Sequence, residues 1–361
     1  MMRKVAPTSS AAFLTALAFT LLLMISCTST NDNNPPQDFS EVPTTSIDSL
    51  QPVIHGQDAM ISSITALETG PNGHIMILDA DQSKVLQFHP NGERYNAFGR
   101  SGKGPGEMVT PRGMDIQDST IRVLDLGTLR INRYTLKGDV IDNFDIQKEA
   151  SYFGFMAMGN SMEYYTVANG INGKLVGHRN AATDSVRYFG EAITPDPPPV
   201  SNEQAFKNSA ASGEVPDAIS NDLVMDYANG HLYVFLKSYS RLQKYDDGEL
   251  LWDVAINHPA NEPIFEKFTD DVQSGPSAFG ILRYIDDMTA TQNHIYLLWN
   301  RTAKGSQSVV KVSSNGTIKK VFELPIEVSA SLSEIAVDTD KNQLYLGDFS
   351  STHVYGLSLD A

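Results

Sequence analysis

Short apolar runs recur along the chain, each introduced by a small or polar residue and ended by a turn. Gly73–Asp79 reads GHIMILD, Gly230–Leu236 reads GHLYVFL, and Asn293–Trp299 reads NHIYLLW. Looser copies lie at Thr120–Asp125 and Gln343–Asp348. Because their apolar residues are consecutive rather than alternating, these five copies predict strands that are buried on both faces.

A second strand and a second turn follow each run at a constant distance. Six residues after the end of a run stands another apolar residue, and a turn that contains glycine comes next. The repeated apolar residues are Val85, Ile131, Leu242 and Val354, and the turns include Asn91-Gly92, Lys137-Gly138 and Asp247-Gly248. Such turns favour hairpins, so the predicted unit is strand, hairpin, strand, hairpin.

The spacing of the copies gives their number. Neighbouring copies end 46 to 63 residues apart, but Asp125 and Leu236 are 111 residues apart. A diverged copy must occupy this interval, with strands expected at Met162–Ala168, Lys174–Asn180 and Ser185–Gly190. The chain therefore contains six units.

Repeats of about 40 to 50 residues with four short antiparallel strands are typical of a β-propeller. In a β-sandwich, one face of each sheet is exposed to solvent, so apolar and polar residues would alternate along its strands instead. We therefore predict an all-β, six-bladed β-propeller of four-stranded antiparallel blades. The last unit has only three strands of its own, so we expect Leu50–His55 to supply its outer strand and close the ring.

The N-terminus has the pattern of a secretory leader. Arg3 and Lys4 precede an uncharged stretch of 16 residues, Ala11–Ser26, which is short for a membrane-spanning helix. The stretch ends in Leu23-Met24-Ile25-Ser26-Cys27, which resembles the lipobox of bacterial lipoproteins. That resemblance implies cleavage before Cys27 and attachment of lipid to its sulfur. A plain secretory signal with a chance cysteine is the alternative.

These features divide the chain into three parts. Residues 1–26 are a predicted lipoprotein signal peptide, and residues 27–47 are a tether rich in Ser, Thr, Asn and Pro. Residues 48–361 are the propeller. The lipid anchor makes a membrane the first expected partner.

The amino-acid composition limits which other classes of partner the protein can bind. Lys and Arg number 27 against 43 Asp and Glu, a net charge of -16, which excludes a partner held by its phosphates, such as nucleic acid. The single cysteine excludes an internal disulfide. We expect a monomeric propeller.

The segments Phe98–Glu107, Pro111–Asp115 and Val123–Ile131 are similar to NHL-type repeats and to the six-bladed propeller lipoproteins common in Bacteroidetes. The resemblance implies a propeller fold and a lipid-anchored position in the cell envelope, on the outer membrane or facing the periplasm. The family has no settled activity to transfer.

Three long connections lead from an outer strand to the next inner strand, at residues 99–110, 191–218 and 257–282, and should gather at one mouth of the channel. A short helix is expected to begin at Asn261 in the third. The glycine-rich first connection carries Arg100 and Lys103, which could bind an anion. Alternatively, it is an interblade turn pinned by Glu107.

Four charged residues occupy equivalent positions near the starts of inner strands and should face the channel: Arg112, Asp222, Asp286 and Glu334. Converging carboxylates suit Ca²⁺, as in the propeller lactonases that this arrangement resembles. A hydrated polar lining is the alternative. No cofactor is predicted, and calcium is the metal that such a site would take.

Two further repeated sets are interpreted as turn residues. His74, His231 and His294 fall on different blades, too dispersed for one metal. Asp115, Asp226 and Asp338 are expected to accept hydrogen bonds within turns.

The sequence favours a non-catalytic binding module for a protein, peptide or glycan, acting through the loop-rich face, because no catalytic motif is present. The alternative is a calcium-assisted hydrolase or lyase with its site at the channel mouth. Whether the protein is an enzyme stays open.

Overall fold

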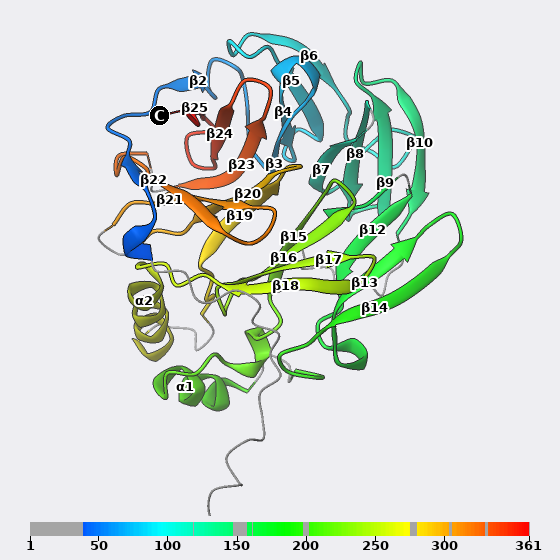
Figure 1. The fold of residues 1–361 in the computed structure, drawn as a ribbon. Coiled ribbons are helices and arrows are strands. Elements are labelled where there is room, and N and C mark those ends of the chain that lie inside the picture. The colour runs from blue at the N-terminus through cyan, green and yellow to red at the C-terminus, as the bar shows by residue number, and fades with distance from the viewer. Residues whose placement is uncertain are drawn as a thin grey trace, which may run out of the picture.

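Six small sheets form a ring around a central channel (Figure 1). The computed structural model describes residues 39–117, 119–146, 157–160, 162–197, 202–274, 280–302, 305–328 and 331–360. Apart from two strands near the N-terminus, described below, the strands of each sheet follow chain order from the channel outward and pair antiparallel. The prediction of six four-stranded blades is confirmed.

The blades are named in chain order. The first three contain β3 (Ala66–Thr69), β4 (Ile75–Asp79), β5 (Lys84–Phe88) and β6 (Arg94–Phe98); β7 (Pro111–Gln117), β8 (Thr120–Asp125), β9 (Arg130–Thr135) and β10 (Val140–Asp145); and β11 (Ala157–Met158), β12 (Glu163–Val167), β13 (Lys174–Asn180) and β14 (Ser185–Glu191). The fourth and fifth contain β15 (Leu223–Ala228), β16 (His231–Leu236), β17 (Arg241–Asp246) and β18 (Glu249–Ala255); and β19 (Ile285–Ala290), β20 (His294–Trp299), β21 (Ser308–Ser313) and β22 (Ile318–Glu323). The sixth contains β23 (Leu332–Asp338), β24 (Gln343–Asp348) and β25 (Val354–Ser358).

The second strand of each blade is buried on both faces, as its run of apolar residues predicts. Every residue of β4 is buried, and in β16 and β20 only the first histidine is partly exposed. Each large side chain buried in this way contributes roughly 1.5–3 kcal/mol. A blade thus becomes stable only when a neighbour covers each of its faces.

Buried aspartates at the ends of second strands tie the blades to the connections between them. Asp125 accepts hydrogen bonds from the backbone N–H groups of Val109 (3.0 Å) and Thr110 (2.7 Å), which lie in the connection from the first blade. Asp79 does the same for Ser62 N–H at 2.8 Å, and Asp348 accepts from the Ser331 hydroxyl at 2.8 Å. The connections are therefore held to the ring by the repeat itself.

The N-terminal segment closes the ring. Strand β2 (Pro52–Ile54) pairs antiparallel with β25, so the predicted outer strand of the last blade is confirmed. Strand β1 (Thr44–Ser46) was not predicted, and it lies parallel to β22 as a fifth strand of the fifth blade. The folded body therefore starts before residue 48, inside the segment interpreted as tether. Thr-Thr-Ser carries no apolar signal, because β1 contributes mainly its backbone.

Two helices decorate the connections and pack side by side (Figure 1). Helix α2 (Asn261–Ser274) begins where predicted, while α1 (Glu203–Ala211) was missed. Their Phe268 and Phe206 rings are 6.1 Å apart. Short 3-10 turns are η1 (Phe39–Glu41), η2 (Pro71–Gly73), η3 (Ile171–Gly173) and η4 (Asp217–Ile219). In the described chain, no helix has the length and apolar character to cross a bilayer.

The channel has two ends, which we name by the loops around them. The insertion mouth is surrounded by the connections between blades, which include both helices. The hairpin mouth, at the opposite end, is surrounded by the hairpins that join the first and second strands of each blade. Because inner strands run from the first mouth to the second, a residue's position in its inner strand gives its depth.

Deleting residues 48–56 is expected to abolish cooperative thermal unfolding, because it removes β2 and leaves β25 as an open edge. Calorimetry of the purified protein would show this. Deleting residues 39–46 is the matched control: it removes β1 but keeps the ring closed, so the melting temperature should fall while the transition stays cooperative. A single sharp transition after the first deletion would contradict the closure.

Candidate functional site

Five carboxylates from five blades face the channel. They are Glu68, Asp115, Asp226, Asp287 and Glu334, and all line a central cavity of about 100 Å³. The strand register places Glu68, Asp115 and Asp226 at one depth and Asp287 and Glu334 nearer the insertion mouth. The channel is therefore acidic at two levels.

Some of these acids join neighbouring blades. Asp226 accepts a hydrogen bond from Ala290 N–H of the next inner strand at 2.6 Å, and Asp287 accepts one from Ile335 N–H at 2.9 Å. Buried Arg122 binds Asp115 and donates to the carbonyl oxygens of Met158 and Gly159 in the third blade. These side chains supply polar bonds where no sheet pairing connects the inner strands.

Desolvation inside the channel favours the neutral form of the acids. It raises the pKa of Asp226 and of Asp287 to about 7. For Glu68 and Glu334, desolvation and then the charges of nearby aspartates raise the pKa well above the usual value. Burial therefore favours the protonated form of both glutamic acids, and a protonated carboxyl group can donate as well as accept a hydrogen bond.

A cavity of about 590 Å³ opens at the hairpin mouth. Its floor contains Glu68, Asp115 and Asp226, and its wall is mostly hydroxyl and amide side chains. These uncharged polar residues are Thr69, Gln117, Asn229, Thr289, Thr291, Gln292, Asn293, Thr339 and Asn342. The sequence predicts a ligand site at the insertion mouth, so the hairpin mouth is a second candidate.

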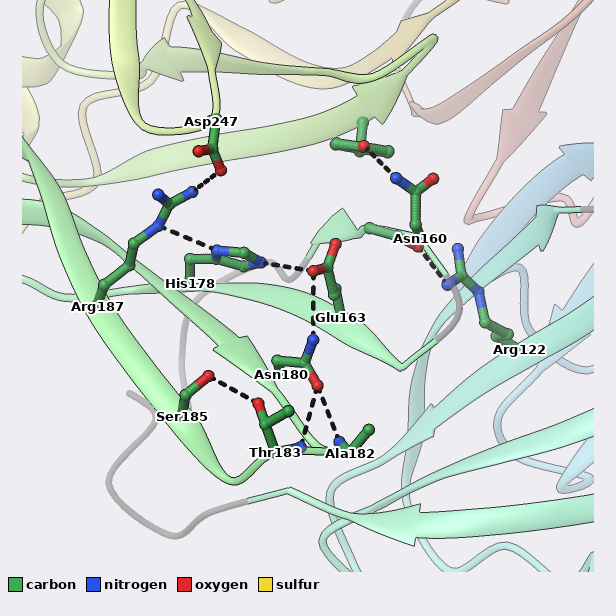
Figure 2. Close-up of polar contacts among 12 residues, drawn as sticks. Arg122, Asn160, Glu163, His178, Asn180, Ala182, Thr183, Ser185, Arg187 and Asp247 are labelled. Carbon is green, nitrogen blue, oxygen red and sulfur yellow. Dashed lines mark hydrogen bonds and ion pairs between the residues drawn. The ribbon is translucent and has the colours of Figure 1, made fainter.

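A polar network supports one side of the hairpin mouth (Figure 2). Arg187 reaches Asp247 of the next blade and donates to His178 at 3.2 Å, and His178 lies 3.6 Å from Glu163. The His178 ring stacks on Tyr165. Tyr165 in turn stacks on Tyr227, which lines the cavity and whose hydroxyl accepts from Asn160 at 3.0 Å. The network therefore orients an aromatic wall and is not itself part of the lining.

The insertion mouth has a smaller cleft of about 340 Å³ between the fifth and sixth blades. Here Asp286 binds Arg283 at 3.2 Å and accepts from the Gln307 amide at 2.8 Å. A neighbouring cavity of about 320 Å³ beside α2 shares Arg283 and Arg301. Most charged groups of this cleft thus already have partners.

The glycine-rich connection holds its own anion. The Glu107 carboxylate accepts from Gly104 N–H and from Arg100, each at 2.8 Å, and these contacts lower the pKa of Glu107. The Arg100 side chain is 77 % exposed, and Lys103 is also exposed. The carboxylate occupies the place where an external anion would bind. Anion binding by Arg100 and Lys103 stays a prediction.

The four charged residues that were predicted to face the channel do not lie together. Asp286 and Glu334 line the cleft at the insertion mouth, and Arg112 and Glu334 line the central cavity. Asp222 is exposed just before β15, and its carboxylate interacts electrostatically with the charge of Lys237. The structure therefore brings together Glu334 with Asp286 and with Arg112, but not all four. In the described part of the chain, no three His, Cys, Asp or Glu side chains converge as metal ligands do.

Sequence reasoning missed several channel residues and misjudged others. Asp115 and Asp226 were interpreted as turn acceptors, which is wrong, since both lie in the channel. The prediction for Asp338 is confirmed, because it accepts from Asp340 and Lys341 N–H groups. His294 lines the large cavity, whereas the repeat predicts a turn residue there. No sequence pattern indicates Glu68 and Asp287.

A signal for these residues did exist. Glu68, Asp115 and Asp226 stand opposite the same position of their second strands in three blades. Alignment of the inner strands by that register would have revealed an acidic level. Asp115 and Asp226 stand at the same distance before their second strands, but Glu68 stands farther from its own, so the repeat in the sequence does not include it.

Comparisons with known proteins agree with this fold. The DUF5128 family, described as a 6-bladed beta-propeller, matches residues 56–185. A Bacteroides fragilis protein whose name describes it as exported is 10 % identical, with 84 % of this chain and 88 % of that chain covered and a TM-score of 0.55. A DUF4221 family member from Bacteroides vulgatus is 12 % identical, with 82 % and 92 % covered and a TM-score of 0.51. No curated protein matches the sequence.

Likenesses at this level of identity establish the fold alone. They bear out the resemblance to Bacteroidetes propellers that the repeats indicated. The chain is therefore a six-bladed β-propeller similar in fold to propeller proteins of Bacteroides, and its residues 56–185 match the DUF5128 family of such propellers.

Proposed function

We propose that this protein is a lipid-anchored binding module of the cell envelope, attached to a membrane through Cys27. The leader and lipobox of residues 1–27 support the anchor. A structural neighbour described as exported supports a position outside the cytoplasm. The propeller presents a ligand site at the hairpin mouth of its channel.

The cavity at the hairpin mouth carries this proposal. Its volume of about 590 Å³ is in the range of small-ligand sites. Within the part of the chain that the structure describes, the Thr289, Gln292 and Thr339 side chains form no hydrogen bond. They are therefore available to a ligand without breaking existing bonds.

The chemistry of the lining favours a glycan among the partners considered. Sugar hydroxyls both donate and accept hydrogen bonds, as do the amide and hydroxyl side chains of this cavity. A charged ligand would find few unpaired charges there. The cleft of the loop-rich face is the weaker candidate, because Arg283, Asp286 and Gln307 are bonded to one another.

The calcium-assisted hydrolase or lyase is the weaker proposal. Asp226 and Asp287, the aspartates best placed for a metal, already accept backbone N–H groups of neighbouring blades.

The double variant Thr289→Val/Gln292→Ala tests the ligand site. Glycan-array and peptide-array screening of the purified propeller should first reveal a glycan ligand. Its affinity should then fall about tenfold for each lost hydrogen bond in the double variant. Gln51→Ala, an exposed glutamine before β2, is the matched control and should bind normally. Binding unaffected by the double variant would remove the hairpin mouth as the site.

Cys27→Ala tests the anchor. Because lipid is added to the Cys27 sulfur, the wild-type protein should incorporate labelled palmitate and fractionate with membranes. In cells treated with globomycin, the uncleaved precursor of the protein should accumulate. The variant should lose the label and appear in the soluble fraction. A soluble, unlabelled wild type would contradict the anchor.

The channel acids predict how stability depends on pH. An acid with a raised pKa holds its proton in the folded state after the unfolded chain has released it, so stability falls as pH rises. Burial lowers the pKa of His258 from 6.5 to about 4, and this has the opposite effect only below pH 6.5. We therefore expect the melting temperature to fall between pH 6.5 and 8.

Glu68→Gln should flatten this fall and raise the melting temperature at pH 8, since a neutral amide replaces a desolvated acid. Glu107→Gln is the control: the pKa of Glu107 is lowered, so its carboxylate is charged throughout this pH range and its loss should not change the slope. Differential scanning fluorimetry measures both. A wild-type melting temperature that is constant from pH 6.5 to 8 would show that the channel acids are ordinary.

A further inference from the structure

The four most exposed large apolar side chains gather on one face of the propeller. They are Ile281 (76 % exposed), Met60 (64 %), Phe349 (62 %) and Ile326 (59 %), and we name them the apolar patch. The other exposed apolar side chains of the described chain do not exceed 46 %. Scattered apolar residues need no explanation, but a gathering of the most exposed ones indicates a surface that contacts something.

All four residues surround the insertion mouth over the fifth, sixth and first blades. Met60, Ile281 and Ile326 lie in connections between blades, and Phe349 lies in the turn after β24. Hydrogen bonds join these segments: Phe349 N–H donates to Ser331 O at 3.0 Å, and the Thr352 hydroxyl donates to Ile61 O at 3.3 Å. Arg283 and Arg301 line both cavities between Phe349 and Ile281. The patch is therefore one sector of one face.

The N-terminal chain joins the propeller on the same face. The Phe39 ring lies 5.2 Å from the His258 ring, and His258 stacks on Trp299 at the end of β20, beside the insertion mouth. Val42 is buried in the core, so this contact is part of the fold. Only eleven residues separate Phe39 from Cys27. At about 3.5 Å per residue they span at most roughly 40 Å, which keeps this face near the anchor.

We propose that the apolar patch rests on the lipid bilayer that holds the anchor, with its side chains inserted among the headgroups. The inference rests on the proposed anchor at Cys27. Insertion of apolar side chains, rather than attraction to anionic lipid, supplies the contact, because the chain carries a net charge of -16 and exposed Asp58 and Glu327 stand beside the patch. Arg283 and Arg301 are placed to meet lipid phosphates.

This orientation gives the two mouths different roles. The insertion mouth faces the membrane, and the cavity of the hairpin mouth opens away from it, toward ligands in solution. The helices α1 and α2 then lie between the ring and the membrane instead of forming a lid over a ligand.

Site-specific fluorescence tests the proposal on the full lipoprotein reconstituted in phosphatidylcholine vesicles. Met60→Cys and Phe349→Cys each introduce a thiol for an environment-sensitive dye. Leu250→Cys and Val186→Cys, on outer strands next to their hairpins at the opposite end, are matched controls with 45 % and 43 % exposure. We expect a blue shift, and quenching by nitroxide-labelled lipid, at positions 60 and 349 but not at 250 or 186.

Equal, water-like emission at all four positions in vesicle-bound protein would overturn the proposal. A blue shift at positions 60 and 349 that depends on protein concentration and needs no lipid would also overturn it, and would assign the patch to contact between copies. Failure of the anchor is distinguishable: a wild-type protein that reacts with the dye has a free Cys27 thiol and is not lipidated.

Discussion

The structure depends on the burial of both faces of each blade by its neighbours. The second strands carry apolar residues at consecutive positions, and these residues are shielded from solvent only because the two neighbouring blades cover them. No blade can therefore be stable alone, and the ring must close. That requirement explains why β2, far from β25 in sequence, completes the last blade. The connections at the insertion mouth take part in this core, since Phe206 of α1 and Phe268 of α2 are buried in it.

The same repeat explains what the sequence could predict. The apolar second strands and the glycine turns after the third strands are regular, so the number of blades, their strands and the closure could be derived from them. The inner strands vary in length from the two residues of β11 to the seven of β7 and β23, and they carry both core residues and channel residues. The repeat of Asp115 and Asp226 was visible in the sequence, but their position in the channel beside Glu68 was not. Strand β1 was missed because an edge strand needs no apolar side chains.

The candidate site shows why charged residues alone were a poor guide. Arg100 and Glu107 satisfy each other within a turn, and Arg283 with Asp286 does so within a cleft. Spacing in the sequence cannot separate such internal pairs from groups that are free for a ligand. The hairpin mouth stands out only in three dimensions, where short hairpins of several blades place ordinary threonines, asparagines and glutamines around one cavity.

The parallel pairing of β1 with β22 has a mechanical consequence. A tensile load applied at the N-terminus reaches β1 before it reaches β2, because Thr44–Ser46 precedes Pro52–Ile54 along the chain. The bonds of Pro43 and Ile47 to β22 must then yield before any force bears on the strand that closes the ring. Strand β1 and the buried Val42 before it therefore stand between a load on the N-terminus and the strand that closes the ring.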